Sequence, residues 1–148
     1  MKDTERLETT IRGLFAGQTV AVLSTQGSEY PHASLVAFAA GDDLRTLLFA
    51  TFRSTRKYEN MSRDPRVALT VDSRTDSNAD LRRTVVATAF GRAQEVPAPD
   101  RKFWQGAYLA RHPSLRAFVE SPDCALMAVQ VQSYDIITDF QNVAALTF

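Results

Sequence analysis

The chain has 148 residues, of which 45% are hydrophobic and 23% charged, and its 17 basic and 17 acidic side chains leave a formal net charge of +0. This length and apolar content predict one domain spanning residues 1–148, with enough material for a real core. The balanced charge argues against bulk binding of nucleic acid or of an acidic surface, because such binding usually needs a basic excess.

The single cysteine, Cys124, cannot form an internal disulfide, so a reducing compartment is expected. The opening residues MKDTERLETT lack the apolar segment of a signal peptide. No apolar run approaches the roughly 20 residues that a membrane-spanning helix needs. We therefore expect a soluble, cytoplasmic protein with no membrane partner.

Apolar residues at helical spacing predict a first helix over residues 3–16, which Gly17 ends. Three apolar stretches with short links follow, and they predict an antiparallel meander rather than alternating strand–helix–strand units. These strands are expected at residues 19–27, 30–40 and 44–51.

The stretch TFRSTRKYENM, residues 51–61, predicts a junction between the third strand and a second helix. Ser54 or Thr55 is expected to be the N-cap, because a hydroxyl there accepts a hydrogen bond from a free backbone N–H. Asp64 and Pro65 are expected to stop the helix at about residue 63.

Two more strands are expected at residues 65–72 and 84–96, joined by a polar segment, 73–83, that has no periodicity. Gly91 inside the second of them predicts a bulge or a sharp bend.

Two helices are then expected at residues 98–112, with Phe103 among its packing residues, and 113–121. A long strand at 124–140 and a short one at 142–148 end the chain. Six or seven strands with three or four helices favour an α+β fold built on a small, closed antiparallel barrel.

The second helix begins among three cations, Arg53, Arg56 and Lys57, where the helix macrodipole is already positive. Each such cation costs a few tenths of a kcal/mol up to about 1 kcal/mol. A phosphate monoester, with close to two negative charges, would reverse that sign and would accept hydrogen bonds from free N–H groups and from Thr51 and Ser54. The alternative is a solvated surface on which acidic neighbours such as Glu59 or Asp64 pair with these cations.

The segment FATFRSTRKYENMSRDPRVALTVD resembles the central motif of the pyridoxamine 5′-phosphate oxidase-like, FMN-binding split-barrel proteins. The flanking segments STQGSEYPHASLVAF and AFGRAQEV resemble neighbouring strands of the same family. The C-terminal part, YLARHPSLRAFVESPDCALMAVQVQSYDIITDF, resembles the small, haem-utilisation-like branch. The similarity runs in the expected order over about residues 18–140.

The resemblance implies an antiparallel split barrel that forms a homodimer with flavin sites at its interface. It also implies that Thr51, Arg56 and Lys57, with Ser54 nearby, hold the FMN phosphate. The strand residues Ala33, Ser34, Leu35 and Val36 would lie along the isoalloxazine ring. Separately from the resemblance, the two histidines and Cys124 lie too far apart in the sequence for a recognisable metal motif.

The resemblance implies an FMN-binding oxidoreductase that acts on an unidentified small molecule. The alternatives are a deazaflavin cofactor, a non-catalytic flavin or haem carrier, and a cofactor-free split-barrel dimer. His32 would exchange protons near the flavin or be an ordinary surface or hydrogen-bonded histidine. His112 is expected to end a helix, with haem ligation as the minor alternative.

Overall fold

A computed structural model describes residues 2–73, 83–139 and 141–148 of the chain. The helices are α1 (Asp3–Gly17), α2 (Arg56–Arg63), α3 (Ala98–Arg111) and α4 (Arg116–Glu120), with a short 3-10 turn, η2 (Pro113–Leu115), before α4. The strands are β1 (Val20–Gln26), β2 (Pro31–Ala40), β3 (Thr46–Phe52), β4 (Arg66–Asp72), β5 (Val86–Glu95), β6 (Cys124–Thr138) and β7 (Asn142–Thr147).

Every helix and strand expected from the sequence is therefore present, with its ends shifted by a few residues. The segment between β4 and β5 that was expected to be a loop lies outside the described residues, apart from its two ends, Ser73 and Arg83.

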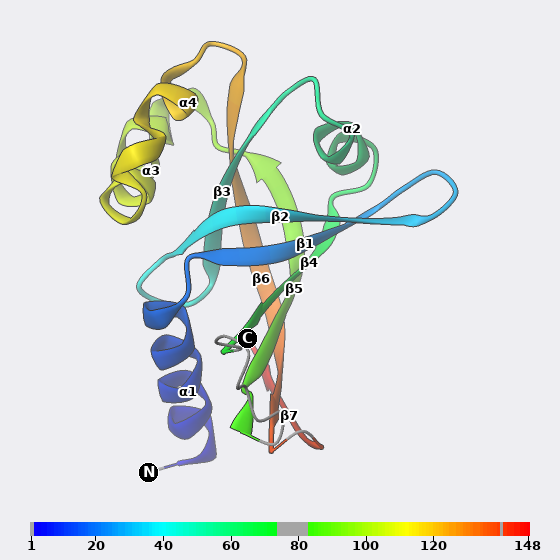
Figure 1. Cartoon of the computed structure of the whole chain (residues 1–148), viewed down its shortest axis with the longest axis vertical. Helices are drawn as coiled ribbons and strands as arrows, with labels where there is room; N and C mark the ends of the chain where they lie inside the picture. The colour runs from blue at the N-terminus through cyan, green and yellow to red at the C-terminus, as the bar shows by residue number, and fades with distance from the viewer. Residues whose placement is uncertain (1, 74–82, 140) are drawn as a thin grey trace.

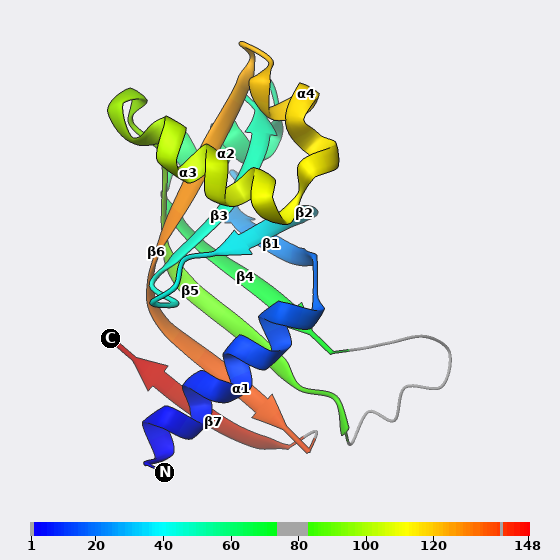
Figure 2. The same ribbon diagram turned by 90° about the vertical axis from the view of Figure 1, so that its left-hand side faces the viewer.

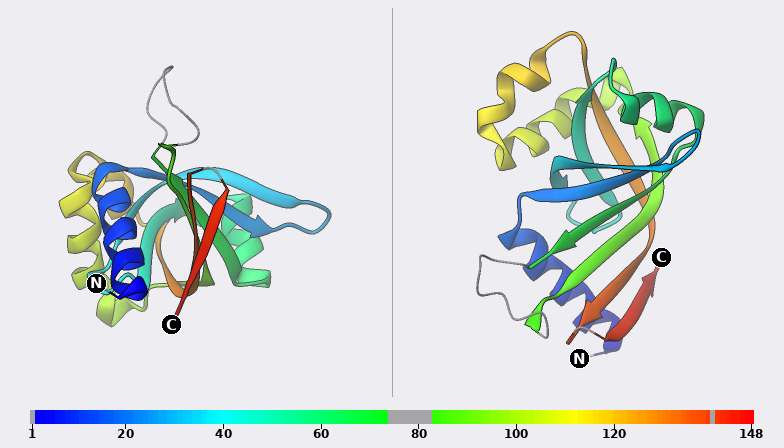
Figure 3. Two further views of the ribbon diagram at one scale, coloured as in Figure 1. Left: turned by 90° about the horizontal axis from the view of Figure 1, so that it is seen from below. Right: turned by 45° about the vertical axis from the view of Figure 1, so that its right-hand side comes forward.

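The strands form one antiparallel sheet in the order β3-β2-β1-β4-β5-β6-β7. A further pairing of β3 with β6 closes the first six strands of that order into a barrel, which Figures 1 and 3 show from several sides. β7 pairs with the C-terminal part of β6, beyond the closed ring. The predicted α+β split barrel is confirmed.

The bulge predicted at Gly91 is present, because the register between β5 and β6 shifts between Phe90 and Gly91. A Cβ atom on Gly91 would lie only 2.2 Å from the carbonyl oxygen of Gln130. A side chain at this position would force the two strands apart, so the bend in the barrel wall depends on glycine.

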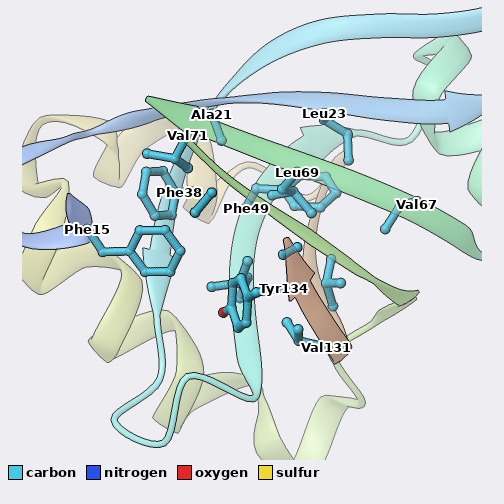
Figure 4. Close-up of a cluster of buried hydrophobic side chains, with 14 of the residues drawn as sticks. Phe15, Ala21, Leu23, Phe38, Phe49, Val67, Leu69, Val71, Val131 and Tyr134 are labelled. Atoms are coloured by element: carbon cyan, nitrogen blue, oxygen red, sulfur yellow. The ribbon is translucent and has the colours of Figure 1, made fainter. Parts of the chain in front are cut away.

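The barrel interior is filled with apolar side chains, and α1 adds Ile11, Leu14 and Phe15 to it. The ring of Phe15 packs edge-on against Phe38 with centroids 5.2 Å apart, and the ring of Tyr134 lies 6.0 Å from that of Phe15 (Figure 4). α1 lies along the barrel at the end away from α2 (Figure 2), so its apolar face seals this end.

A second, smaller cluster lies between the outer face of the barrel and the helices α3 and α4. Leu48 of β3 and Leu126 of β6 meet Tyr108 and Val119 there, and all four are nearly inaccessible to solvent. The expectation that Phe103 packs in the core was wrong, since it is 71% exposed on the solvent side of α3.

Candidate functional site

The barrel is split along one edge of β2. On one side, β2 pairs with β1 continuously from Pro31 to Ala37. On the other side it pairs with β3 only at Phe38–Ala40, after which β3 continues against β6 alone. In the described part of the chain, the first seven residues of β2 therefore have a strand partner on one edge only, which leaves backbone groups free to bind a ligand.

α2 begins beside this split, at the end of β3. Thr55 is its N-cap, as the sequence allowed, because its hydroxyl oxygen accepts a hydrogen bond from the N–H of Tyr58 at 3.3 Å. The helical geometry leaves the N–H groups of Arg56 and Lys57 without intrahelical acceptors. The positive end of the helix thus opens toward solvent with two basic side chains attached.

Thr51 supports this helix start from inside the barrel. It is buried, and its hydroxyl lies 2.8 Å from that of Thr55 and 3.2 Å from the carbonyl oxygen of Phe52. The structure therefore shows Thr51 stabilising the turn that positions the cap. Ser54, the other predicted hydroxyl, is exposed at the surface of the same turn.

Arg53 is held by the protein itself. Its guanidinium pairs with both carboxylate oxygens of Glu95 on β5 and donates to the carbonyl oxygen of Pro122 at 2.8 Å. The hydroxyl of Tyr58 donates to the same carboxylate at 2.9 Å. Arg53 therefore joins β3, β5 and the segment before β6, and its charge is already paired within the protein.

This cluster shifts the pKa values of its members. The hydrogen bond from Arg53 holds the pKa of Glu95 below its ordinary value, and the Glu95 carboxylate raises the pKa values of Arg53 and Tyr58. Glu95 is consequently an anion that is already neutralised, and it leaves the other two cations of the motif uncompensated.

Arg56 and Lys57 have no ion pair in the described part of the chain. The acidic residues that could have paired with them have other partners: Glu59 lies 3.9 Å from Arg63, and Asp64 binds Arg66 at 2.7 Å. The hydrogen bonds from Arg66 lower the pKa of Asp64 to about 2. We call the group of Ser54, Arg56 and Lys57 the phosphate corner.

The predicted β2 residues divide between two faces. Ala33 and Leu35 point outward and are exposed, whereas Val36 is buried in the barrel core. Ser34 points inward on the same face as Val36, and its hydroxyl oxygen is buried without a hydrogen-bond partner in the described structure. The structure thus brings the β2 edge and the phosphate corner to the same end of the barrel but orients the four side chains differently.

The barrel end that α2 covers is polar. Asn60 of α2 is buried, and its amide nitrogen donates to the hydroxyl of buried Thr25 on β1 at 3.0 Å. Thr25 lies opposite His32 in the β1–β2 ladder, and Nδ1 of His32 is also buried without a partner. A buried polar group without a partner costs about 1–3 kcal/mol of stability. A ligand that bonded to His32 at this end of the barrel would remove such a cost.

The remaining sequence candidates are structural. His112 is the C-cap of α3, and its Nε2 lies 2.6 Å from the carbonyl oxygen of Phe38. Cys124 is buried, and burial raises the pKa of its thiol. No cluster of three or more potential metal ligands occurs in the part of the chain that the structure describes.

The residues at this corner fit the phosphate of a flavin mononucleotide in three respects. Among the described residues, Arg56 and Lys57 are cations without an ion pair at a helix N-terminus, Ser54 presents an exposed hydroxyl on the same turn, and the neighbouring edge of β2 has no strand partner from Pro31 to Ala37. An anionic nucleotide at this position would give each of these groups a partner, so the chemistry of the donors matches the group that the resemblance implies.

Sequence reasoning missed Glu95 and Asn60, whereas it did offer Thr55 beside Ser54 as a candidate N-cap. Glu95 is 42 residues from Arg53, and Asn60 is 35 residues from Thr25, so neither contact has a sequence spacing that would predict it.

No described helix has the length and hydropathy of a membrane-spanning segment. No curated protein sequence matches the chain.

Among solved structures, a haem-binding protein from Mycobacterium smegmatis superposes with a TM-score of 0.82 at 18% identity, over 92% of this chain and 55% of its own. The chain thus spans about half the length of that protein. General Stress Protein 26 from Bacillus anthracis superposes with a TM-score of 0.71 at 21% identity, over 97% of this chain and 99% of its own. A FAD-binding protein from Mesorhizobium loti gives a TM-score of 0.68 at 18% identity, over 88% of this chain and 90% of its own.

At these identities the structural matches show the fold alone. The sequence model of the pyridoxamine 5′-phosphate oxidase family, however, matches residues 7–136, which include β1 to β5, most of β6, α2 and the phosphate corner. The chain therefore belongs to the pyridoxamine 5′-phosphate oxidase-like family.

Proposed function

We propose that the protein is an FMN-binding oxidoreductase acting on a small organic molecule. The observation that carries this proposal is the pair of uncompensated cations, Arg56 and Lys57, at the N-terminus of α2 beside the unpaired edge of β2. Family membership and the description of one structural relative as FAD-binding support the flavin class.

In this proposal each group has a defined task. The side chains of Arg56 and Lys57 and the hydroxyl of Ser54 donate hydrogen bonds to the phosphate. The free backbone edge of β2 along Ala33–Val36 binds heteroatoms of the isoalloxazine ring. The flavin itself supplies the redox chemistry, by accepting a hydride from a donor and passing the electrons on.

A second copy of the chain is part of the proposal. Leu35 is 71% exposed on the outer face of β2, and Val20 and Phe90 are other large exposed apolar side chains on the barrel wall. A homodimer that covers this wall would enclose the ring from the side opposite β2. Light scattering of the eluted protein tests it, and a monomer at micromolar concentration would contradict it.

The chemistry of the chain supports a cytoplasmic location, because its one thiol is buried and unpaired. Deazaflavin, haem carriage and a cofactor-free dimer remain competing outcomes of the tests below, since no specific contact of the described residues favours any of them.

The experiment is a titration of the purified protein with FMN, compared with a deazaflavin and with haemin. Tight FMN binding with a flavin spectrum that a nicotinamide donor bleaches is expected. A Soret band with no flavin binding, preference for the deazaflavin, or a colourless protein that ignores all three would each overturn the proposal.

Arg56→Ala and Lys57→Ala are the matched variants. Each removes a charged hydrogen bond worth about 1.5–3 kcal/mol, so the Kd for FMN should rise about 10- to 150-fold. Lys102→Ala, which removes an exposed cation from α3, is the control and should leave the affinity unchanged.

A further inference from the structure

A pocket of about 350 Å³ lies between α2 and the turn that joins β1 to β2, and we call it the hairpin pocket. One wall is formed by the turn from Gly27 to Tyr30 and the first two residues of β2, and the other by α2 residues Arg56, Glu59, Asn60 and Arg63. These four have the spacing i, i+3, i+4, i+7, so they form one face of the helix. The pocket therefore follows the whole length of α2 and shares Arg56 with the phosphate corner.

The hairpin pocket adjoins the end of β2 that the proposed ring leaves free. It contacts Pro31 and His32 at the start of the strand, whereas the backbone edge proposed for the isoalloxazine continues from Ala33 to Val36. A group attached to the phosphate on the side away from the ring would enter this pocket.

The far end of the pocket is formed by Arg63, the last residue of α2 and about 10.5 Å from Arg56 along the helix axis. Its guanidinium donates to the side-chain oxygen of Asn60 at 3.0 Å, while the side chain stays 48% exposed. A planar guanidinium held in this way can stack on the face of a base.

The opposite wall offers a second stacking surface and further polar groups. Tyr30 at the tip of the hairpin is 77% exposed. Glu29 and Glu59 both line the pocket, and their carboxylates can accept hydrogen bonds from ribose hydroxyls. The unpartnered Nδ1 of His32 lies in the same wall.

The charges in the pocket indicate which ligand it fits. Two arginines and two glutamates nearly cancel, so the pocket offers little attraction to a free polyphosphate. It suits a neutral, polar and partly aromatic group, and its volume is at the low end of the roughly 300–1,000 Å³ typical of ligand pockets.

We infer that the hairpin pocket is a nucleoside subsite, which binds the adenosine half of a flavin dinucleotide whose flavin-side phosphate lies at the phosphate corner. This inference rests on the proposed function and extends it, because it makes flavin adenine dinucleotide a better ligand than FMN.

Calorimetric titration of the full chain with FMN and with flavin adenine dinucleotide tests the inference. The dinucleotide should bind at least about tenfold more tightly than FMN. Tyr30→Ala and Arg63→Ala should each weaken dinucleotide binding by about fivefold or more, as expected for one lost stacking partner, and should leave FMN binding unchanged. Tyr30 is so exposed that its replacement leaves the fold intact, which a thermal melt would verify.

Equal affinities for the two flavins, or equal losses for both flavins in the two variants, would overturn the inference while the proposed function stands. Failure of both flavins to bind would remove the inference together with the proposed function. Lys102→Ala is again the control and should alter neither affinity.

Discussion

The two ends of the barrel are closed by helices of opposite character. The end sealed by α1 is apolar, with Phe15 packed on Phe38 beside Tyr134. The end covered by α2 is polar, with Thr25 and Asn60 bonded to each other and with buried atoms that lack partners nearby. The first end contributes packing energy, whereas at the second end some described polar atoms and cations have no partner, as the proposed binding site requires.

The largest expected loss of stability comes from a substitution in the apolar end of the barrel. Phe15→Ala should lower the free energy of unfolding by about 3–5 kcal/mol, because it removes a buried ring and leaves a cavity beside Phe38. Denaturant unfolding measures this. A decrease in the free energy of unfolding below about 1 kcal/mol would show that the packing of α1 contributes little to the stability of the core.

A smaller effect is expected at the polar end. Asn60→Ala removes the donor to Thr25 and the acceptor for Arg63, and it should cost about 1–3 kcal/mol of stability. Denaturant unfolding of the cofactor-free protein gives the value. A cost as large as that of Phe15→Ala would contradict the contrast between the two ends.

The ion pair next to α2 predicts a pH effect. Because Arg53 lowers the pKa of Glu95 in the folded state, the pair contributes stability above the unfolded pKa, near 4.5, and loses it as the pH falls through the lowered folded value. Both side chains are about a third exposed, so the contribution is discounted to about 0.2–1 kcal/mol.

Unfolding measured at about pH 6 and about pH 3 tests this, since Glu95→Gln should lose less stability over that interval than the unaltered protein. An identical pH dependence of the two proteins would show that Glu95 is not the titrating group.

The smallest expected change in stability is at Arg56, and its sign distinguishes a binding residue from a structural one. Replacing Arg56 with alanine in the cofactor-free protein should leave stability unchanged or raise it by a few tenths of a kcal/mol, because it removes a cation from the positive helix end. A thermal melt without flavin measures it. Clear destabilisation would make Arg56 a structural residue.

Local sequence signals were enough for the elements of the fold. Apolar spacing located α1, Gly91 marked the bulge, and the hydroxyls at 54 and 55 marked the start of α2. The misassignment of Phe103 shows the limit of such signals, because an aromatic residue on a helix does not reveal which face the helix buries.

The candidate site was predictable only in part, because some of its features depend on contacts between residues far apart in the sequence. The unusual placement of Arg56 and Lys57 was visible in the sequence, and the structure leaves both unpaired among the described residues. The neutralisation of Arg53 by Glu95 and the free edge of β2 depend on strand order, which no local pattern encodes.

The one-sided pairing of β2 also has a dynamic consequence. β6 pairs with β3, β5 and β7, whereas in the described part of the chain the first half of β2 pairs with β1 only. Amide hydrogens along that half should exchange with deuterated solvent sooner than those of β6. Among the described strands, the first half of β2 is therefore the part of the barrel wall that we expect to open most readily, because backbone hydrogen bonds hold it along one edge only.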